Sequence, residues 1–139
     1  FRYLTSINKL IEKLNIEDRV RILGYIPQED LISLYNMARL FISVSFYEGF
    51  GLPVLEAMSC GIPVITSKIS SLPEAGGDAV YYIDPFNVND IKKALVEVVK
   101  NKSIRQRMIK KGFKQAKKFS WMISAKKLNL LYQQLIISK

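Results

Sequence analysis

Residues 40–65 read LFISVSFYEGFGLPVLEAMSCGIPVI, and this stretch decides the fold class. Its first five residues are almost continuously apolar, which is typical of a short parallel strand covered on both faces. Pro53 has a backbone φ suited to a first helical turn, which predicts a helix over residues 53–60 with Gly61 in its C-capping region. Residues 63–66 then predict a second buried strand. A strand, a loop, a helix and a second strand in this order indicate an α/β domain.

The segments on either side extend this alternation of helix and strand. Apolar residues at helical spacing predict helices over residues 3–14, 27–37 and 88–100, and short apolar or alternating runs predict strands over residues 19–23 and 79–83. Two more helices are expected over residues 103–119 and 121–137, with Ser103 and Ser120 as their N-caps. We therefore predict a mostly parallel sheet with flanking helices, followed by C-terminal helices. Ligands bind beyond the carboxyl ends of such strands, so the loops after residues 23, 45, 66 and 84 are expected to share one rim.

Two carboxylates flank the start of the helix predicted from Pro53. Glu48 is expected on the loop and Glu56 on the helix, with Gly49 and Gly51 between them. The glycines permit positive φ or a close approach of the backbone to a ligand. The free amides at a helix start form a natural site for phosphate, and the glutamates can accept hydrogen bonds from hydroxyls on either side of it. A nucleotide-sugar site requires this arrangement.

The composition excludes several kinds of catalytic site. The 139 residues include no histidine and one cysteine, Cys60. This excludes serine–histidine and cysteine–histidine nucleophiles as well as histidine or thiolate zinc sites. We also expect no metal or other cofactor, because amides and basic groups can neutralise a diphosphate. One cysteine cannot form an internal disulfide, and no apolar run is long enough to cross a bilayer. These observations favour a soluble, cytoplasmic domain in which Cys60 is a small core residue.

The net charge of +9 is concentrated in the C-terminal part of the chain. From Val88 onward there are 14 Lys and Arg against 2 Asp and Glu, whereas the residues before it contain 7 and 10. Such a basic region can face an acidic N-terminal domain, anionic lipid or nucleic acid. The alternative is a solvated face on helices that bury their other side.

Five blocks of sequence carry a resemblance to a known family. They are DRVRILGYIP at residues 18–27, LY at 34–35 with Ala38, SFYEGFGLPVLEAMSCGIPVI at 45–65, LPE at 72–74 and FSW at 119–121. In order and spacing they resemble the C-terminal half of the retaining glycosyltransferases of family 4, which have two Rossmann-like domains in the GT-B arrangement. The resemblance covers nearly the whole chain, residues 1–139, and implies a domain that binds a nucleotide-sugar donor.

The resemblance also implies roles for individual residues. Glu56 would accept hydrogen bonds from the ribose hydroxyls, helped to remain charged by a place in the first helical turn. Glu48 would approach the transferred sugar and act as the catalytic carboxylate. The diphosphate or sugar hydroxyls would meet the backbone of Gly49, Phe50, Gly51, Leu52 and Val54. The base would be contacted by Gly24, Tyr25 and Ile26.

The chain departs from the family pattern at two places. Ser70 and Ser71 stand where the family commonly has a pair of glycines. The family domain also begins with two further strands, the first followed by basic groups that neutralise the leaving diphosphate. We therefore expect those strands to lie outside these residues, the sheet to be incomplete or rearranged, and the segment alone to be inactive. In the usual strand order, the further strands would separate the strand at Val20 from the strand at Leu40.

The leading hypothesis is the donor-binding half of a retaining glycosyltransferase that transfers a hexosyl group to a sugar, lipid-linked or polysaccharide acceptor. Its expected partners are the donor, an N-terminal acceptor-binding domain of the same protein and an anionic surface at the inner membrane face, but not nucleic acid. A nucleotide-sugar epimerase of related fold and a non-catalytic nucleotide- or polyanion-binding module are the alternatives. A glycosidase that uses both glutamates is disfavoured, because the glycines and the helix start suit phosphate better than water placement.

Overall fold

The computed structural model describes residues 2–137, with side chains from residue 4 to residue 136. The chain forms two compact units, which meet in the sequence between Leu31 and Ile32. The N-terminal unit contains α1 (Arg2–Lys13), a short 3-10 turn (Glu17–Arg19) and the first residues of α2 (Gln28–Met37). The helices predicted over residues 3–14 and 27–37 are therefore confirmed.

The strand predicted over residues 19–23 is wrong. Residues 20–24 have no regular secondary structure, and the side chains of Val20, Ile22 and Leu23 are exposed. An alternating sequence forms a strand only where a neighbouring strand pairs with its amides and carbonyls. Among residues 2–137, no strand of the sheet pairs with this segment, so its amides and carbonyls form no sheet ladder.

The C-terminal unit is built on a three-stranded parallel sheet in the order β1 (Phe41–Ser43), β2 (Val64–Ser67) and β3 (Tyr81–Ile83). Ile42 of β1 lies opposite Ile65 of β2, and Thr66 of β2 lies opposite Tyr82 of β3. The central strand β2 is buried along its whole length, which confirms the buried strand predicted over residues 63–66. The predicted fold class, a parallel sheet with flanking helices, is confirmed.

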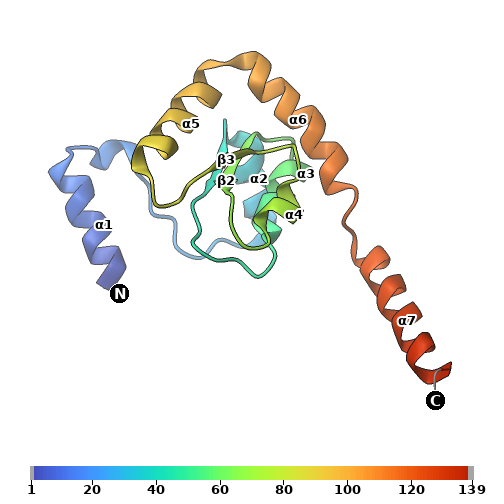
Figure 1. Ribbon diagram of the computed structural model, residues 1–139. Helices are drawn as coiled ribbons and strands as arrows, with labels where there is room; N and C mark the ends of the chain where they lie inside the picture. The colour runs from blue at the N-terminus through green and yellow to red at the C-terminus, as the bar shows by residue number, and fades with distance from the viewer. Residues whose placement is uncertain (1, 138–139) are drawn as a thin grey trace. The chain divides into compact units, whose positions relative to one another are not determined.

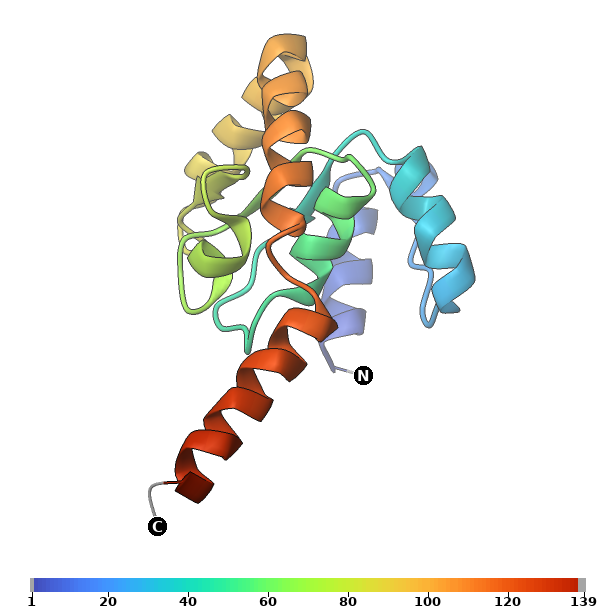
Figure 2. The same ribbon diagram turned by 90° about the vertical axis from the view of Figure 1, so that its right-hand side faces the viewer.

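Five helices surround or follow this sheet: α3 (Leu52–Ser59), α4 (Leu72–Gly76), α5 (Val88–Lys100), α6 (Lys102–Ala116) and α7 (Trp121–Ile137). Figures 1 and 2 show that α6 runs alongside α3 and α4, and packing contacts join these helices. The C-cap of α3 is Cys60, and Gly61 follows it with φ +73°, which confirms that Gly61 lies in the C-capping region. The helix predicted over residues 103–119 begins one residue earlier and ends at residue 116.

The capping residues of the last two helices were only partly predicted. Ser120 caps α7, because its Oγ accepts a 3.1 Å hydrogen bond from the amide of Ile123. Ser103 does not cap α6; the cap is Asn101, whose Oδ1 accepts from the amide of Ile104 at 3.1 Å. Asn and Ser are equally good N-caps. Asn101 is the cap because α5 ends at Lys100, which leaves Asn101 as the extended residue between the two helices.

The core forms where the sheet meets α5 and α6. Its buried members are Ile65, Ile83, Ala94, Val98 and Met108. A second group of fully buried side chains, Val54, Ala57, Met58 and Leu72, comes from α3 and α4. Both helices that carry this second group start near the carboxyl ends of strands. The rim of the sheet is therefore anchored directly in the core.

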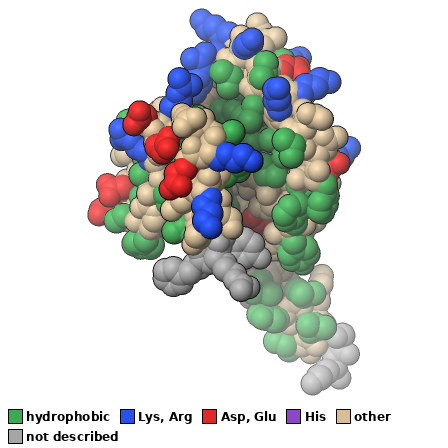
Figure 3. Space-filling model, turned by 90° about the vertical axis from the view of Figure 1, so that its left-hand side faces the viewer, with side chains coloured by type: hydrophobic (Ala, Val, Ile, Leu, Met, Phe, Trp, Pro, Cys, Tyr) green, Lys and Arg blue, Asp and Glu red, His purple; other side chains and the backbone are tan. Residues whose placement is uncertain are grey.

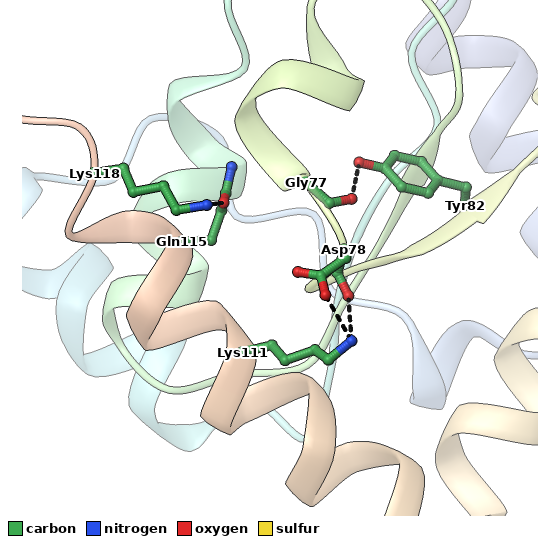
Figure 4. Close-up of polar contacts among 6 residues, drawn as sticks. All are labelled: Gly77, Asp78, Tyr82, Lys111, Gln115 and Lys118. Atoms are coloured by element: carbon green, nitrogen blue, oxygen red, sulfur yellow. Dashed lines mark hydrogen bonds and ion pairs between the residues drawn. The ribbon is translucent and has the colours of Figure 1, made fainter.

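A polar contact ties α4 and the turn after it to α6. Buried Gln115 of α6 donates from Nε2 to the carbonyls of Glu74 at 3.0 Å and Ala75 at 3.2 Å. Figure 4 shows Lys111 of the same helix reaching Asp78, with Nζ 2.7 Å from Oδ2. Because α4 follows the loop after β2, these contacts help to fix that loop.

The helix α7 extends from the C-terminal end of α6, and every described side chain from Trp121 to Ile136 is exposed. Figure 3 shows hydrophobic side chains along the visible part of this helix. Among the described residues, no helix has the length and apolar character needed to cross a membrane. Cys60, predicted as a core residue, is only half-buried.

Candidate functional site

Three loops meet at the carboxyl ends of the three strands. The main-chain carbonyl of Glu48, in the loop after β1, accepts hydrogen bonds from Ser70 Oγ at 2.7 Å and Ser71 Oγ at 2.9 Å in the loop after β2. The ring centroid of Phe46, also after β1, lies 4.8 Å from that of Phe86 after β3. The shared rim predicted for the loops after residues 45, 66 and 84 is confirmed, whereas residue 23 ends no strand.

Hydroxyl groups hold the side chain of Glu48, which is half-buried. Ser45 Oγ donates a 2.7 Å hydrogen bond to Glu48 Oε1, and the hydroxyl oxygens of Ser43 and Ser45 are 3.3 Å apart. Thr66 Oγ1, buried in β2, donates to the carbonyl of Ser43 at 3.2 Å. An ionised carboxylate has about four acceptor positions. Glu48 therefore has the capacity to accept a hydrogen bond from a ligand hydroxyl while Ser45 keeps it in place.

The helix α3 starts from a left-handed residue at the rim. Gly51 is its N-cap, with φ +94° and ψ +41°. The amide of Val54 already donates to the carbonyl of Gly51 at 3.0 Å, and Pro53 has no N–H. A ligand at this helix start would therefore meet chiefly the amides of Phe50, Gly51 and Leu52. The exposed Gly49 precedes them in the same loop.

Glu56 lies on the exposed side of α3, and one of its partners is a tyrosine from another helix. Tyr35 Oη of α2 donates a hydrogen bond to Glu56 Oε2 at 3.2 Å. Glu56 is the fifth residue of α3, so the expectation that it lies in the first helical turn is wrong. The helix begins at Leu52, and the favourable field of a helix start is largely confined to its first turn. Orientation of the Glu56 carboxylate therefore comes from Tyr35.

Burial and the neighbouring charge of Glu56 raise the pKa of Tyr35 to about 12. An unfolded tyrosine ionises near pH 10. Stability due to the protonated Tyr35 should thus be fully present below pH 10 and be lost as the pH rises to about 12. We expect the difference in free energy of unfolding between wild type and Tyr35→Phe to change over this window. Urea unfolding of both full-length proteins at the two ends of the window measures it, and a constant difference would contradict the assignment.

The candidate base-contacting residues belong to the N-terminal unit. Gly24, Tyr25 and Ile26 follow the segment that was predicted as a strand. The Tyr25 ring is 92% exposed, which leaves its face free for a ligand and argues against a packing role in its own unit. Ile26 is half-buried. Contact of these three residues with a base stays a prediction.

A cavity of about 410 Å³ borders the loop on the α7 side. Its lining is mostly apolar and consists of Phe50, Leu52, Leu55, Phe119, Ser120, Trp121 and Ser124. The rings of Phe50 and Phe119 meet edge to face with centroids 5.5 Å apart. An apolar cavity does not suit a diphosphate, which requires amides or cations. The polar rim beside Glu48 and Gly51 is the better seat for that group.

Sequence reasoning missed several residues that hold the site. Tyr35, Ser45, Ser70 and Ser71 each donate a hydrogen bond to one of the two glutamates. In the sequence, the serine pair differs from the glycines that are common in the family. This difference is the only sequence signal that points to the hydroxyl groups at this site. Within residues 2–137, no cluster of three or more His, Cys, Asp or Glu residues could hold a metal ion.

Comparisons with known proteins agree with this description. The family model for glycosyl transferases group 1 matches residues 2–115. The O-antigen chain mannosyltransferase B of Escherichia coli is 49% identical over 113 residues, which are 81% of this chain and 30% of that protein.

Solved structures of glycosyltransferases share the fold. Sucrose-phosphate synthase from Thermosynechococcus elongatus superimposes with a TM-score of 0.82 at 30% identity, over 96% of this chain and 34% of that one. The Anabaena protein HepE, solved in complex with UDP and glucose, has a TM-score of 0.80 at 20% identity, over 99% of this chain and 37% of that one, and shows likeness of fold alone. The chain thus spans about a third of the length of these proteins. Its fold is that of a GT-B glycosyltransferase domain of the C-terminal type, and the chain belongs to the glycosyl transferases group 1 family.

Proposed function

We propose that this chain is the donor-binding half of a retaining glycosyltransferase that transfers a hexosyl group from a nucleotide diphosphate sugar. The observation that carries the proposal is the rim at which Glu48, the left-handed start of α3 and Glu56 follow one another. One carboxylate is held by Ser45 and the other by Tyr35, and helix-start amides lie between them in the sequence. A sugar, a diphosphate and a ribose require these three kinds of group in this order.

Each group has a distinct proposed task. Glu56 accepts hydrogen bonds from the ribose hydroxyls, and the amides of Phe50, Gly51 and Leu52 bind the diphosphate or the sugar hydroxyls. Glu48 accepts a hydroxyl of the transferred sugar and stabilises positive charge that develops at the anomeric carbon. A metal ion is not required in this scheme, because the amides at the start of α3 and basic groups from the rest of the full-length protein would neutralise the diphosphate.

Relatives suggest which sugar is transferred. The E. coli relative at 49% identity is named a mannosyltransferase, so we propose a mannosyl group for this chain. A structure of the same fold contains UDP and glucose, which supports a nucleoside diphosphate at the rim. The acceptor is proposed to bind an N-terminal domain of the same protein, and the cytoplasm is the proposed location.

The test is a donor screen on the full-length protein. UDP, GDP and ADP derivatives of mannose and glucose are titrated calorimetrically, and products are identified by mass spectrometry with and without mannose oligosaccharides as acceptor. We expect one nucleotide sugar to bind and to glycosylate the acceptor with retained anomeric configuration. Conversion of the donor alone to a second nucleotide sugar would indicate an epimerase. Failure of every nucleotide sugar to bind would contradict the proposal.

A basic face suggests where the protein acts. Arg107, Lys110 and Lys114 of α6 are exposed, whereas Met108 of the same helix is buried. Figure 3 shows further basic side chains gathered where α5 passes into α6. We propose that this face binds an anionic membrane surface. Replacing these three cations by Gln should lower co-sedimentation of the full-length protein with phosphatidylglycerol vesicles. Equal loss on replacing Lys126 and Lys127 of α7 would contradict a specific role for α6.

A further inference from the structure

Two serine hydroxyls of the loop after β2 converge on one atom of the loop after β1, which carries Glu48. Ser70 Oγ and Ser71 Oγ donate to the main-chain carbonyl of Glu48 at 2.7 Å and 2.9 Å. A carbonyl oxygen accepts two hydrogen bonds, so this pair fills its capacity. The side chain of the same residue is held by Ser45 at 2.7 Å. Glu48 is thus fixed through its main chain and its side chain by groups on two loops.

Ser70 adopts a backbone conformation that favours glycine. Its φ is +53°, in the left-handed region that non-glycine residues rarely enter. Its side chain is exposed and therefore contributes little to packing. Glycine would adopt this backbone without strain but would bring no hydroxyl. The contribution of serine at this position that glycine cannot replace is the hydrogen bond to Glu48.

The two serines are carried by a rigid support. The amide of Lys68 donates to the carbonyl of Ile83 at 3.1 Å, which extends the pairing of β2 with β3 into the loop. Ser71 is the N-cap of α4, and the next residue, Leu72, is fully buried. Buried Gln115 of α6 holds the carbonyls of α4 from the other side. Movement of the Glu48 carbonyl is therefore resisted by a segment that is itself anchored in the core.

We propose that Ser70 and Ser71 are positioning residues that act together to hold Glu48 against the transferred sugar. The inference rests on the proposed function of Glu48. The nucleotide is bound by other groups, namely Glu56 and the amides at the start of α3. Loss of the serine hydroxyls should therefore lower the rate of transfer much more than the affinity for the nucleotide.

The test uses full-length Ser70→Gly, Ser71→Ala and the double variant, with Ser71→Thr as the conservative variant that keeps a hydroxyl. Ser59→Ala is the matched control, because Ser59 Oγ donates to a main-chain carbonyl, that of Leu55, at 2.8 Å near the far end of α3. For each protein, kcat for mannosyl transfer, the Kd for the nucleoside diphosphate and the free energy of unfolding are measured.

We expect the double variant to lose about tenfold or more in kcat, while the Kd for the nucleoside diphosphate changes less than about twofold. Ser71→Thr should keep most of the activity, and Ser59→Ala should match wild type. Ser70→Gly should lower kcat without lowering stability, because it removes a hydroxyl and a strained φ together. A merely structural role would make activity and stability fall together. A parallel fall in activity and stability would overturn the proposal. An unchanged kcat, or equal losses in kcat and affinity, would overturn it as well.

A crystal structure of the double variant separates this proposal from the proposed function. We expect the Glu48 carbonyl and carboxylate to move from their wild-type positions. Retention of the wild-type position of Glu48 would overturn the positioning role, whether or not the protein transfers sugar. Displacement of Glu48 in a protein whose wild type binds no nucleotide sugar would support the positioning role and refute the proposed function alone.

Discussion

Glu48→Gln is expected to lower kcat for sugar transfer by about 10²–10³-fold, the usual cost of removing a group that stabilises transition-state charge. Glutamine has nearly the same shape and keeps an acceptor for the 2.7 Å hydrogen bond from Ser45. The substitution therefore preserves the local structure and removes the negative charge that we propose to face the anomeric carbon. The Kd for the nucleoside diphosphate should stay within about twofold of wild type, because the proposed nucleotide contacts are Glu56 and the amides at the start of α3.

Glu97→Gln is the matched control for this experiment. Glu97 of α5 also accepts a hydrogen bond from a hydroxyl, at 2.9 Å from Tyr81 Oη. Tyr81 is the first residue of β3, at the end of the sheet opposite the rim. The Glu97→Gln substitution should therefore leave kcat unchanged. Similar kcat values for wild type and Glu48→Gln, or similar losses of kcat in Glu48→Gln and Glu97→Gln, would show that Glu48 has no specific role in the reaction.

Gly51→Ala is expected to lower the free energy of unfolding by about 2–4 kcal/mol and to weaken donor binding. Gly51 has φ +94°, and a Cβ built there lies 2.8 Å from Leu72 Cδ2. Leu72 is fully buried and cannot move aside without disturbing the core. Part of the loss is backbone strain and part is overpacking. The same methyl group would also displace the loop from a bound diphosphate.

Gly49→Ala provides the comparison within the same loop. A Cβ at Gly49 meets no heavy atom within 4 Å, and its φ lies outside the left-handed region. Its free energy of unfolding should therefore remain within about 0.5 kcal/mol of wild type. Urea unfolding of the full-length variants measures both effects. Equal stabilities of the two alanine variants would show that Gly51 is not constrained in this way.

Local pattern predicted most of the elements in the sheet and helices. The short buried strand predicted over residues 63–66 is the central strand Val64–Ser67, and the helical spacing over residues 88–100 predicts α5. The segment at residues 19–23 has an equally regular pattern, but no strand within residues 2–137 pairs with it, and it remains irregular. Periodicity describes which face of a segment is apolar. Whether a strand forms also depends on partners elsewhere in the chain.

Sequence motifs also located the two glutamates, but not the residues that hold them. Tyr35 is 21 residues from Glu56, and Ser70 is 22 residues from Glu48. The first pair joins α2 to α3 and the second joins the loops after β1 and β2, so both form only once these elements have packed together. The left-handed φ of Ser70 likewise depends on the folded loop, because serine has no local preference for it. The positions of acidic groups could be predicted, whereas their orientation required the structure.

The central claim is that the rim beside α3 binds the nucleotide of a sugar donor, with Glu56 on the ribose. It is tested most directly by calorimetric titration of UDP, GDP and ADP into full-length wild type, Glu56→Gln and Glu97→Gln. Glutamine at this position keeps an acceptor for Tyr35 but removes the charge-assisted hydrogen bonds to the ribose, which contribute about 1.5–3 kcal/mol. We predict that one nucleoside diphosphate binds wild type and Glu97→Gln equally, and binds Glu56→Gln about tenfold or more weakly. Equal affinity for Glu56→Gln and wild type would contradict the account.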